Sequence, residues 1–166
     1  MLQTRKKPMQ RNNQIGFIVG DTTASELSFF LIKGINDYID NGGKEDFTLF
    51  VENSSANIID PNFAVMSMSE IWNFQGDLFS TSVSTSLSMN KCFAPKSKYF
   101  YVWDLEWIRN DGREYEKTIQ AFLPEQTKII AKSKDHAKAI KNYSNREVDY
   151  IIENINIEKI ARITNE

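Results

Sequence analysis

The chain is poor in the two residue types that most often form cross-links and metal sites. Its 166 residues include one cysteine, Cys92, and one histidine, His136. One cysteine forms no intrachain disulfide and completes no cysteine-based zinc site, and one histidine excludes a metal site built on several histidines. We therefore expect a reduced, cytoplasmic protein with no metal and no other cofactor.

Long apolar segments and an excess of one charge are also missing. No run approaches the roughly 20 apolar residues that a membrane-spanning helix needs, so we expect no membrane contact. The 20 Lys and Arg residues nearly balance the 22 Asp and Glu residues, which leaves a net charge of −2. A chain with this balance has no general attraction to nucleic acid, which we do not expect as a partner.

The basic residues are unevenly distributed along the chain. Residues 1–13 contain no acid and four basic residues, namely Arg5, Lys6, Lys7 and Arg11. Such a cluster without interleaved aromatic residues is typical of a solvated tail. We therefore divide the chain into a basic N-terminal arm, residues 1–13, and one domain, residues 14–166, of ordinary domain length.

Within that domain, short apolar runs alternate with segments of helical periodicity. The predicted strands are residues 14–20, 47–52, 63–68, 98–107, 127–131 and 148–153. Helices are predicted from a Thr23–Glu26 capping box to residue 40, and over residues 113–123, 134–143 and 157–163. Residues 78–92 read as a strand followed by a helix. This order predicts an α/β fold, a single Rossmann-like doubly wound and mostly parallel sheet with helices on both faces.

Ligands of such sheets bind outside the carboxyl ends of the strands, where the strand order reverses. The positions at the carboxyl ends of predicted strands, or just after them, are therefore our candidate ligand-binding residues: Gly20, Asp21, Thr22, Glu52, Asn53, Trp107 and Ser133. The segment after the first strand has neither G-x-G-x-x-G nor a Walker-A pattern, so it predicts neither a dinucleotide nor a nucleoside triphosphate. There we favour an ordinary tight turn and helix cap over an anion site.

Asp104 and Glu106 are the candidate catalytic residues. They end an aromatic strand between Trp103 and Trp107. Paired carboxylates beside aromatic rings can act as acid and base, or can bind sugar hydroxyls while a ring stacks on the sugar. The alternative is that one carboxylate caps the following loop and both tryptophans belong to the core.

Two other reactive side chains, His136 and Cys92, are not expected to take part in catalysis. His136 falls in the first turn of a helix that Ser133 would cap, a place more typical of an exposed or capping histidine than of a catalyst. Cys92 precedes Phe93 and is expected to pack in the core. No serine or cysteine lies in a nucleophile elbow, so a hydrolase triad has no support.

Five segments carry a resemblance to a known family: QIGFIVGDTTASELSFFLIKGINDYI, FTLFVE, KYFYVWDLEW, TKIIAKSKDHAKAI and VDYIIENINIEKI. Their order resembles the N-terminal half of two-domain (GT-B fold) glycosyltransferases. The closest points are the apolar strand followed by Ser133 and a helix, and residues 151–156, which look like that family's link to its second domain.

The resemblance implies an acceptor-side domain, because in that family the second domain binds the nucleotide-sugar donor. The sequence ends at Glu166, where that domain would start. The implied options are a separate donor-binding subunit or a second copy, a fragment, or a non-catalytic binding protein. The leading hypothesis is a glycosyltransferase-like half-domain with a sugar or glycan acceptor.

The alternative is a non-enzymatic module that binds a protein partner or forms a homo-oligomer through aromatic residues such as Trp72, Phe74 and Trp107. The use of lysine over arginine, 14 residues against 6, suggests an AT-rich genome such as that of a phage.

Overall fold

The computed structural model describes residues 13–109 and 113–166. They form a sheet of seven strands in the order β3-β2-β1-β4-β5-β6-β7, and every strand pair in it is parallel. The strands are β1 (Gln14–Val19), β2 (Asp46–Val51), β3 (Ala64–Ser67), β4 (Asp77–Ser80), β5 (Ser97–Tyr101), β6 (Thr127–Ala131) and β7 (Tyr150–Ile151). The expected Rossmann-like α/β fold is confirmed. The proposed arm, residues 1–13, lies outside the described residues except for Asn13.

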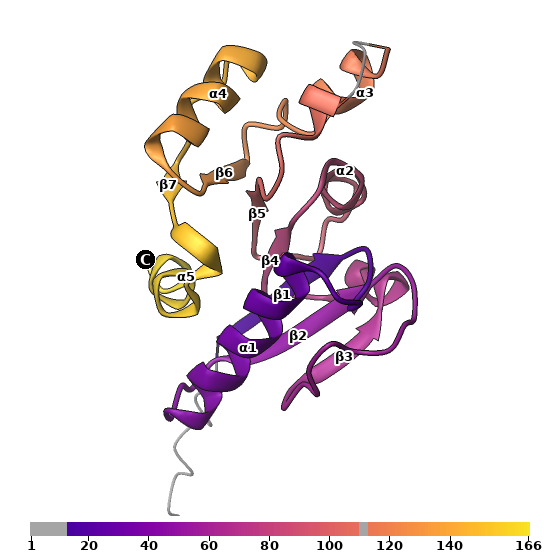
Figure 1. Cartoon of the computed structure of the whole chain (residues 1–166), viewed down its shortest axis with the longest axis vertical. Coiled ribbons are helices and arrows are strands. Elements are labelled where there is room, and N and C mark those ends of the chain that lie inside the picture. Colours follow the sequence, from indigo (N-terminus) through magenta and orange to yellow (C-terminus); the bar gives the residue numbers. More distant parts are fainter. Residues whose placement is uncertain (1–12, 110–112) are drawn as a thin grey trace, which may run out of the picture.

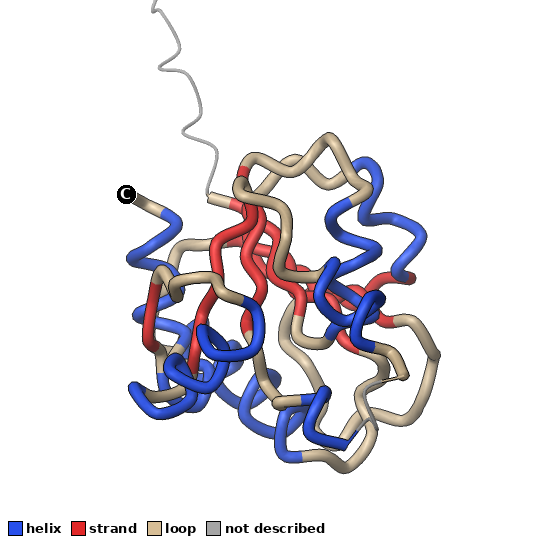
Figure 2. Tube along the Cα trace, turned by 90° about the horizontal axis from the view of Figure 1, so that it is seen from above, coloured by secondary structure: helices blue, strands red, loops and turns tan. Residues whose placement is uncertain are grey.

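Helices cover both faces of the sheet (Figures 1 and 2). Their bounds are α1 (Glu26–Asp40), α2 (Val83–Asn90), α3 (Tyr115–Gln120), α4 (Lys134–Ser144) and α5 (Ile157–Thr164). Side chains of α1 and α5 pack on one face, whereas those of α2 and α4 pack on the other. Three short 3-10 helices complete the fold: η1 (Met68–Asn73), η2 (Glu106–Arg109) and η3 (Glu153–Ile155).

The alternation of side chains along each strand explains why both faces are apolar. In β1, Phe17 lies in the core beneath α1 and α5, and Ile18 lies in the core beneath η1 and α2. In β5, Tyr101 and Phe100 divide between the two faces in the same way. Because inner strands such as β1 and β5 bury both sets of side chains, their sequences are nearly continuous apolar runs. Cys92 is fully buried, as expected.

Several predicted boundaries are wrong. The fifth strand ends at Tyr101 rather than at residue 107, so Asp104 lies in a loop and Glu106 begins η2. The last strand has two residues instead of the six over 148–153. The helix predicted over 113–123 is confined to Tyr115–Gln120. After β5, the apolar and aromatic residues Val102 and Trp103 continue beyond the end of the strand, and composition alone does not reveal where a strand ends.

The start of α1 also differs from the prediction. Ser25 is the N-cap, and its side chain accepts a hydrogen bond from the backbone N–H of Ser28. The predicted box from Thr23 to Glu26 does not form, because Thr23 is engaged by Asp21 two residues before it. At the other end, Gly42 has φ +86°, a left-handed conformation that glycine adopts without strain.

Candidate functional site

The strand order reverses between β1 and β4. From β1 the chain returns through α1 to β2, and from β4 it continues through α2 to β5 on the opposite side. The two connections therefore diverge at the carboxyl ends of these strands, where ligands of doubly wound sheets bind. Thr81 joins the two strands there, since its hydroxyl donates to the Ile18 carbonyl at 2.8 Å.

The loop after β1 is a closed turn. The Asp21 carboxylate accepts hydrogen bonds from the Thr23 backbone N–H at 2.9 Å and from the Thr23 hydroxyl at 2.5 Å. These bonds hold the pKa of Asp21 below its usual value. Thr22 is buried, and its N–H donates to the Ser55 hydroxyl at 3.2 Å. The carboxylate and the engaged backbone groups make this loop a poor place for a phosphate.

Glu52 extends from the end of β2 across the reversal point. Its backbone N–H donates to Val19, and the neighbouring Asn53 N–H donates to Gly20 at 2.9 Å. A Cβ on Gly20 would lie 3.8 Å from the Glu52 side-chain oxygen, so the carboxylate passes over the loop after β1. On the far side, the Ser84 hydroxyl donates to the Glu52 carboxylate at 3.4 Å.

Glu106 reaches the same helical turn from the opposite side. Its Oε1 accepts a hydrogen bond from the Val83 backbone N–H at 2.7 Å, at the first residue of α2. One of the two carboxylates therefore does act as a cap. It caps α2, however, and not the loop that follows it in the sequence, as one interpretation expected. Burial raises the pKa of Glu106, and the nearby charge of Asp104 raises it further.

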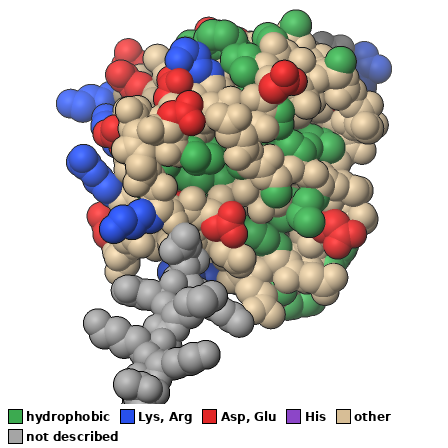
Figure 3. Space-filling model, turned by 90° about the horizontal axis from the view of Figure 1, so that it is seen from below, with side chains coloured by type: hydrophobic (Ala, Val, Ile, Leu, Met, Phe, Trp, Pro, Cys, Tyr) green, Lys and Arg blue, Asp and Glu red, His purple; other side chains and the backbone are tan. Residues whose placement is uncertain are grey.

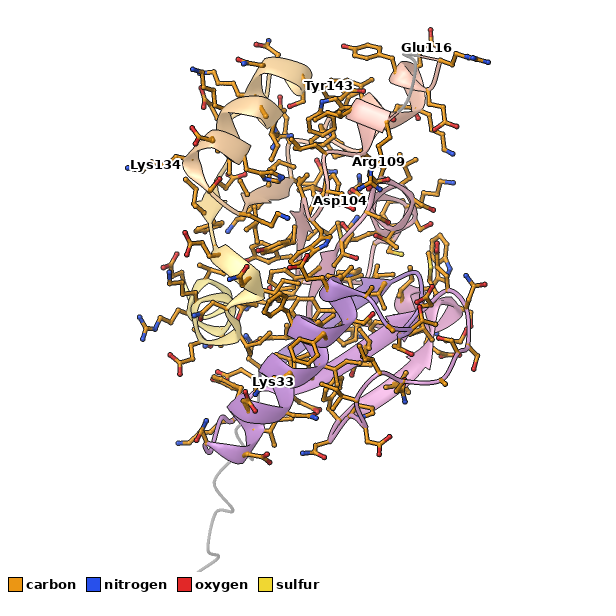
Figure 4. All side chains as sticks on the ribbon, in the orientation of Figure 1. Lys33, Asp104, Arg109, Glu116, Lys134 and Tyr143 are labelled. Carbon is orange, nitrogen blue, oxygen red and sulfur yellow. The ribbon has the colours of Figure 1, made fainter. Side chains whose placement is uncertain are left out.

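Asp104 is the more exposed of the two candidate catalytic carboxylates. Its side chain lies 3.7 Å from Arg109 Nη2, and the two residues are adjacent beyond β5 in Figure 4. Its negative charge contributes to the raised pKa of Glu106, and it opposes the lowering of the pKa of His136. The three residues therefore share one electrostatic environment at the carboxyl ends of β5 and β6.

His136 belongs to this group, although sequence reasoning treated it as a surface or capping residue. Ser133 caps α4 by accepting from the His136 N–H, and this turn brings His136 Nδ1 to 3.3 Å from the Lys132 backbone N–H. Because Nδ1 accepts that bond, the neutral ring carries its proton on Nε2. Nε2 is buried and has no partner in the described structure. Burial and the charge of Lys132 lower the pKa of His136.

Aromatic rings flank the group on both faces of the sheet. Lys132 Nζ lies 4.3 Å from the centre of the buried Trp103 ring, a cation–π contact. Trp107 stacks on Tyr143 with ring centres 4.2 Å apart, and it also contacts Phe122 edge-on. Trp107 is thus partly used in packing, whereas Ser133 is used as a helix cap.

Other features of the described residues lie apart from this group. A cavity of about 340 Å³ lies between α1 and the start of α5, and none of the predicted site residues lines it. Seen from below, the molecule shows apolar side chains between separate carboxylates (Figure 3).

Within the described ranges, no cluster of three His, Cys, Asp or Glu residues could hold a metal ion. No helix there has the length and apolar character to cross a membrane.

Comparison with known proteins adds no family: no protein-family model, curated protein or solved structure matches the chain. The fold and the geometry of the site therefore define a Rossmann-like α/β protein with a carboxylate-rich group at its strand ends.

Proposed function

We propose that this protein is the acceptor-side half of a glycosyltransferase-like assembly, which binds a sugar or glycan and acts with a donor-binding partner or a second copy. The observation that carries the proposal is the convergence of Glu52 and Glu106 on the first turn of α2. Asp104 adds a third carboxylate beside Glu106. The fold is consistent with the resemblance, which required a parallel doubly wound sheet.

The charge of this group favours an acceptor over a nucleotide. Carboxylates accept hydrogen bonds from sugar hydroxyls, and they repel the phosphates of a nucleotide sugar. Gly20 and Asp21 would border the same crevice, and Asn53 would add an amide.

Glu106 is the group best suited to take a proton. A raised pKa brings a carboxylate closer to the value that suits general-base catalysis near neutral pH. In the proposed step, Glu106 removes the proton of an acceptor hydroxyl. The hydroxyl oxygen then forms a bond to the anomeric carbon of the donor, and the bond from that carbon to the nucleotide breaks as the nucleoside diphosphate leaves with the electron pair.

The first experiment is a thermal-shift screen of the purified chain against free sugars, oligosaccharides, nucleotides and nucleotide sugars. We expect stabilisation by a sugar or oligosaccharide. A ligand at about 100 times its Kd stabilises a protein by about 2.7 kcal/mol. Stabilisation by nucleotides alone would contradict an acceptor-side role.

Variants then assign the binding to the site. Asp104→Asn and Glu52→Gln should weaken sugar binding about tenfold each, since each loses one charged acceptor. Glu147→Gln is the matched control, because Glu147 pairs with Lys141 on the surface. Equal loss of binding in the control would contradict the assignment.

A non-enzymatic interaction module is the second candidate, and the observation that favours it is the exposure of Trp72, at 51%. For a binding module, Asp104→Asn and Glu106→Gln should leave partner affinity unchanged. For an enzyme, Glu106→Gln should abolish transfer once the donor-binding partner is supplied, and Asp104→Asn should lower it about tenfold.

A further inference from the structure

The cavity of about 340 Å³ between α1 and α5 continues into a second hollow. This second hollow, of about 520 Å³, lies at the end of α1 and beside the last turn of α5. Tyr38, Asn41 and Glu158 line both hollows, so the two are continuous, and together we call them the α1–α5 groove. The two helices that form it lie side by side on one face of the sheet (Figure 1).

One part of the groove has an aromatic and apolar wall. Phe29 and Phe30 line it from α1, with their rings edge to face and 5.8 Å apart, and Ile157 lines it from α5. Gly34 lets the helices approach closely there, since a Cβ on it would lie 3.1 Å from the Ile157 side chain. Phe29 is 40% exposed, so part of this wall is open to a ligand. Such a surface favours contact with an apolar chain.

The groove also lies at the negative end of α1. The last turn of this helix contains Asp37 and no basic residue, so no side chain there compensates the helix dipole. Residues 37–46, which lead from this turn into β2, contain four acids and one lysine. The Tyr38 hydroxyl donates to the Glu45 carboxylate, and burial, this bond and the charges of Glu45 and Glu158 raise the pKa of Tyr38 to about 12. The electrostatic potential at this end of the groove therefore favours a cation.

Glu158 is the carboxylate best placed to bind that cation. It is exposed, and it lies in the first turn of α5, where the two hollows meet. Among the described residues, none forms an ion pair with its side chain. Asp37, by contrast, already pairs with Lys33 at 2.5 Å.

The rim of the groove at η3 has an unusual backbone conformation. Asn154 and Ile155 have φ angles of +47° and +50°, which residues other than glycine rarely adopt. Ile155 is held there by its N–H, which donates to the buried Tyr101 hydroxyl at 3.2 Å. Strained backbone persists where the surrounding structure fixes it, and it is frequent at ligand sites. This rim is therefore in place before any ligand binds.

We propose that the α1–α5 groove binds a linear diamine or polyamine, with its methylene chain against Phe29, Phe30 and Ile157 and one ammonium group at Glu158. A second ammonium group would face the acidic end of α1, residues 37–46. The combination of features selects this class: an inorganic cation would leave the apolar wall uncovered, and an anion would be repelled. The groove uses none of the residues of the sugar site, so this inference does not depend on the proposed function.

Isothermal titration calorimetry of the full chain at low ionic strength tests the ligand class. Spermidine should bind with a Kd on the order of 1 mM, and cadaverine about threefold more weakly. Pentanediol and glutarate have the same chain length without a positive charge, and they should bind at least about tenfold more weakly than cadaverine. Added salt should weaken the binding of spermidine, because the groove is open to solvent.

Three outcomes of this titration would overturn the proposal. Absence of spermidine binding would exclude the ligand class. Equal binding of pentanediol and cadaverine would mean that the groove takes an uncharged chain. Binding of acetyl-lysine methylamide as tight as that of spermidine would identify the lysine side chain of a protein as the occupant.

Variants of exposed residues assign the binding to the groove. Glu158→Gln should weaken spermidine binding about fivefold, and Phe29→Ala about threefold, since the ligand loses a countercharge in one and apolar contact in the other. Arg162→Gln should tighten it about twofold, because Arg162 brings a positive charge to the groove. Glu70→Gln, on η1 and outside the groove, is the matched control and should bind as the wild type does. Equal losses in the Glu158 and Glu70 variants, or weaker binding by Arg162→Gln, would place the ligand elsewhere and overturn the proposal.

Discussion

The two ends of the parallel sheet hold buried carboxylates in different ways. At the carboxyl ends, Glu106 is half-buried and accepts a hydrogen bond from the Val83 N–H. At the amino ends, Asp77 begins β4 with 1% exposure, and neither of its oxygens accepts a hydrogen bond in the described structure. Lys96 Nζ, 3.6 Å from Asp77, supplies a countercharge and also donates to the Thr164 carbonyl.

Glu106 is thus stabilised by the start of a helix, whereas Asp77 is stabilised by one cation, Lys96. The first turn of α2 presents free N–H groups and the positive end of a helix dipole to Glu106. Asp77 lies where strands begin and depends on a lysine that is more than half exposed. A buried charge with few partners is costly, so we expect the amino end to be the more sensitive to loss of its partner.

The largest expected effect is therefore that of Lys96→Met. Removing the lysine leaves Asp77 buried without a countercharge, and we expect the free energy of unfolding to fall by about 3 kcal/mol. Urea denaturation at pH 7 measures it. A fall of less than about 0.5 kcal/mol in the free energy of unfolding would show that Lys96 does not stabilise the buried charge of Asp77.

Glu106→Ala should come next, with a loss of about 1–2 kcal/mol, since the Val83 N–H loses a charged acceptor. Glu106→Gln retains an oxygen that can accept this bond, so we expect a loss below about 1 kcal/mol. The same denaturation experiment compares them. Equal losses in the two variants would mean that charge, rather than hydrogen bonding, matters at this position.

Asp77→Asn should stabilise the protein by up to about 1 kcal/mol. The change removes a buried charge, and the lysine that remains is solvated. The melting temperature should rise, and a fall would show that the ion pair more than compensates for the burial of Asp77.

The smallest expected effect is a pH dependence due to Glu106. Its pKa is raised in the folded state, so its contribution to stability is complete below its unfolded pKa and is lost as pH rises through the folded pKa. Glu106→Gln does not titrate. The stability of the variant relative to wild type should therefore increase as pH rises from about 4 toward neutrality, and denaturation curves across this range measure it. A relative decrease would contradict the direction of the shift.

Much of the local structure was predictable because its cause is local. The apolar runs at β1 and β6 and the Ser133 cap of α4 follow from residues that lie within a few positions of each other. The end of β5 at Tyr101 was not predictable in this way, because Val102 and Trp103 are still apolar and aromatic after the strand ends.

The site shows the same division. Candidates at the strand ends could be selected from the sequence, since parallel strands bring their carboxyl ends to one edge. The meeting of Glu52 and Glu106 on α2 could not, because 32 and 23 residues separate the bonded partners. His136 was missed for a similar reason, since the depth at which its ring is buried depends on the packing of α4 against β6.

The sequence by itself thus determined the order of strands and helices, the parallel α/β class and the set of polar residues available at the strand ends. Apolar periodicity and caps act over one or two turns of chain, which is why these features can be read directly. The tertiary structure alone decided which carboxylates share the first turn of α2, that Asp77 is buried beside Lys96, and that a cavity lies between α1 and α5. These depend on contacts between distant segments, and the burial that results sets the cost of each charge.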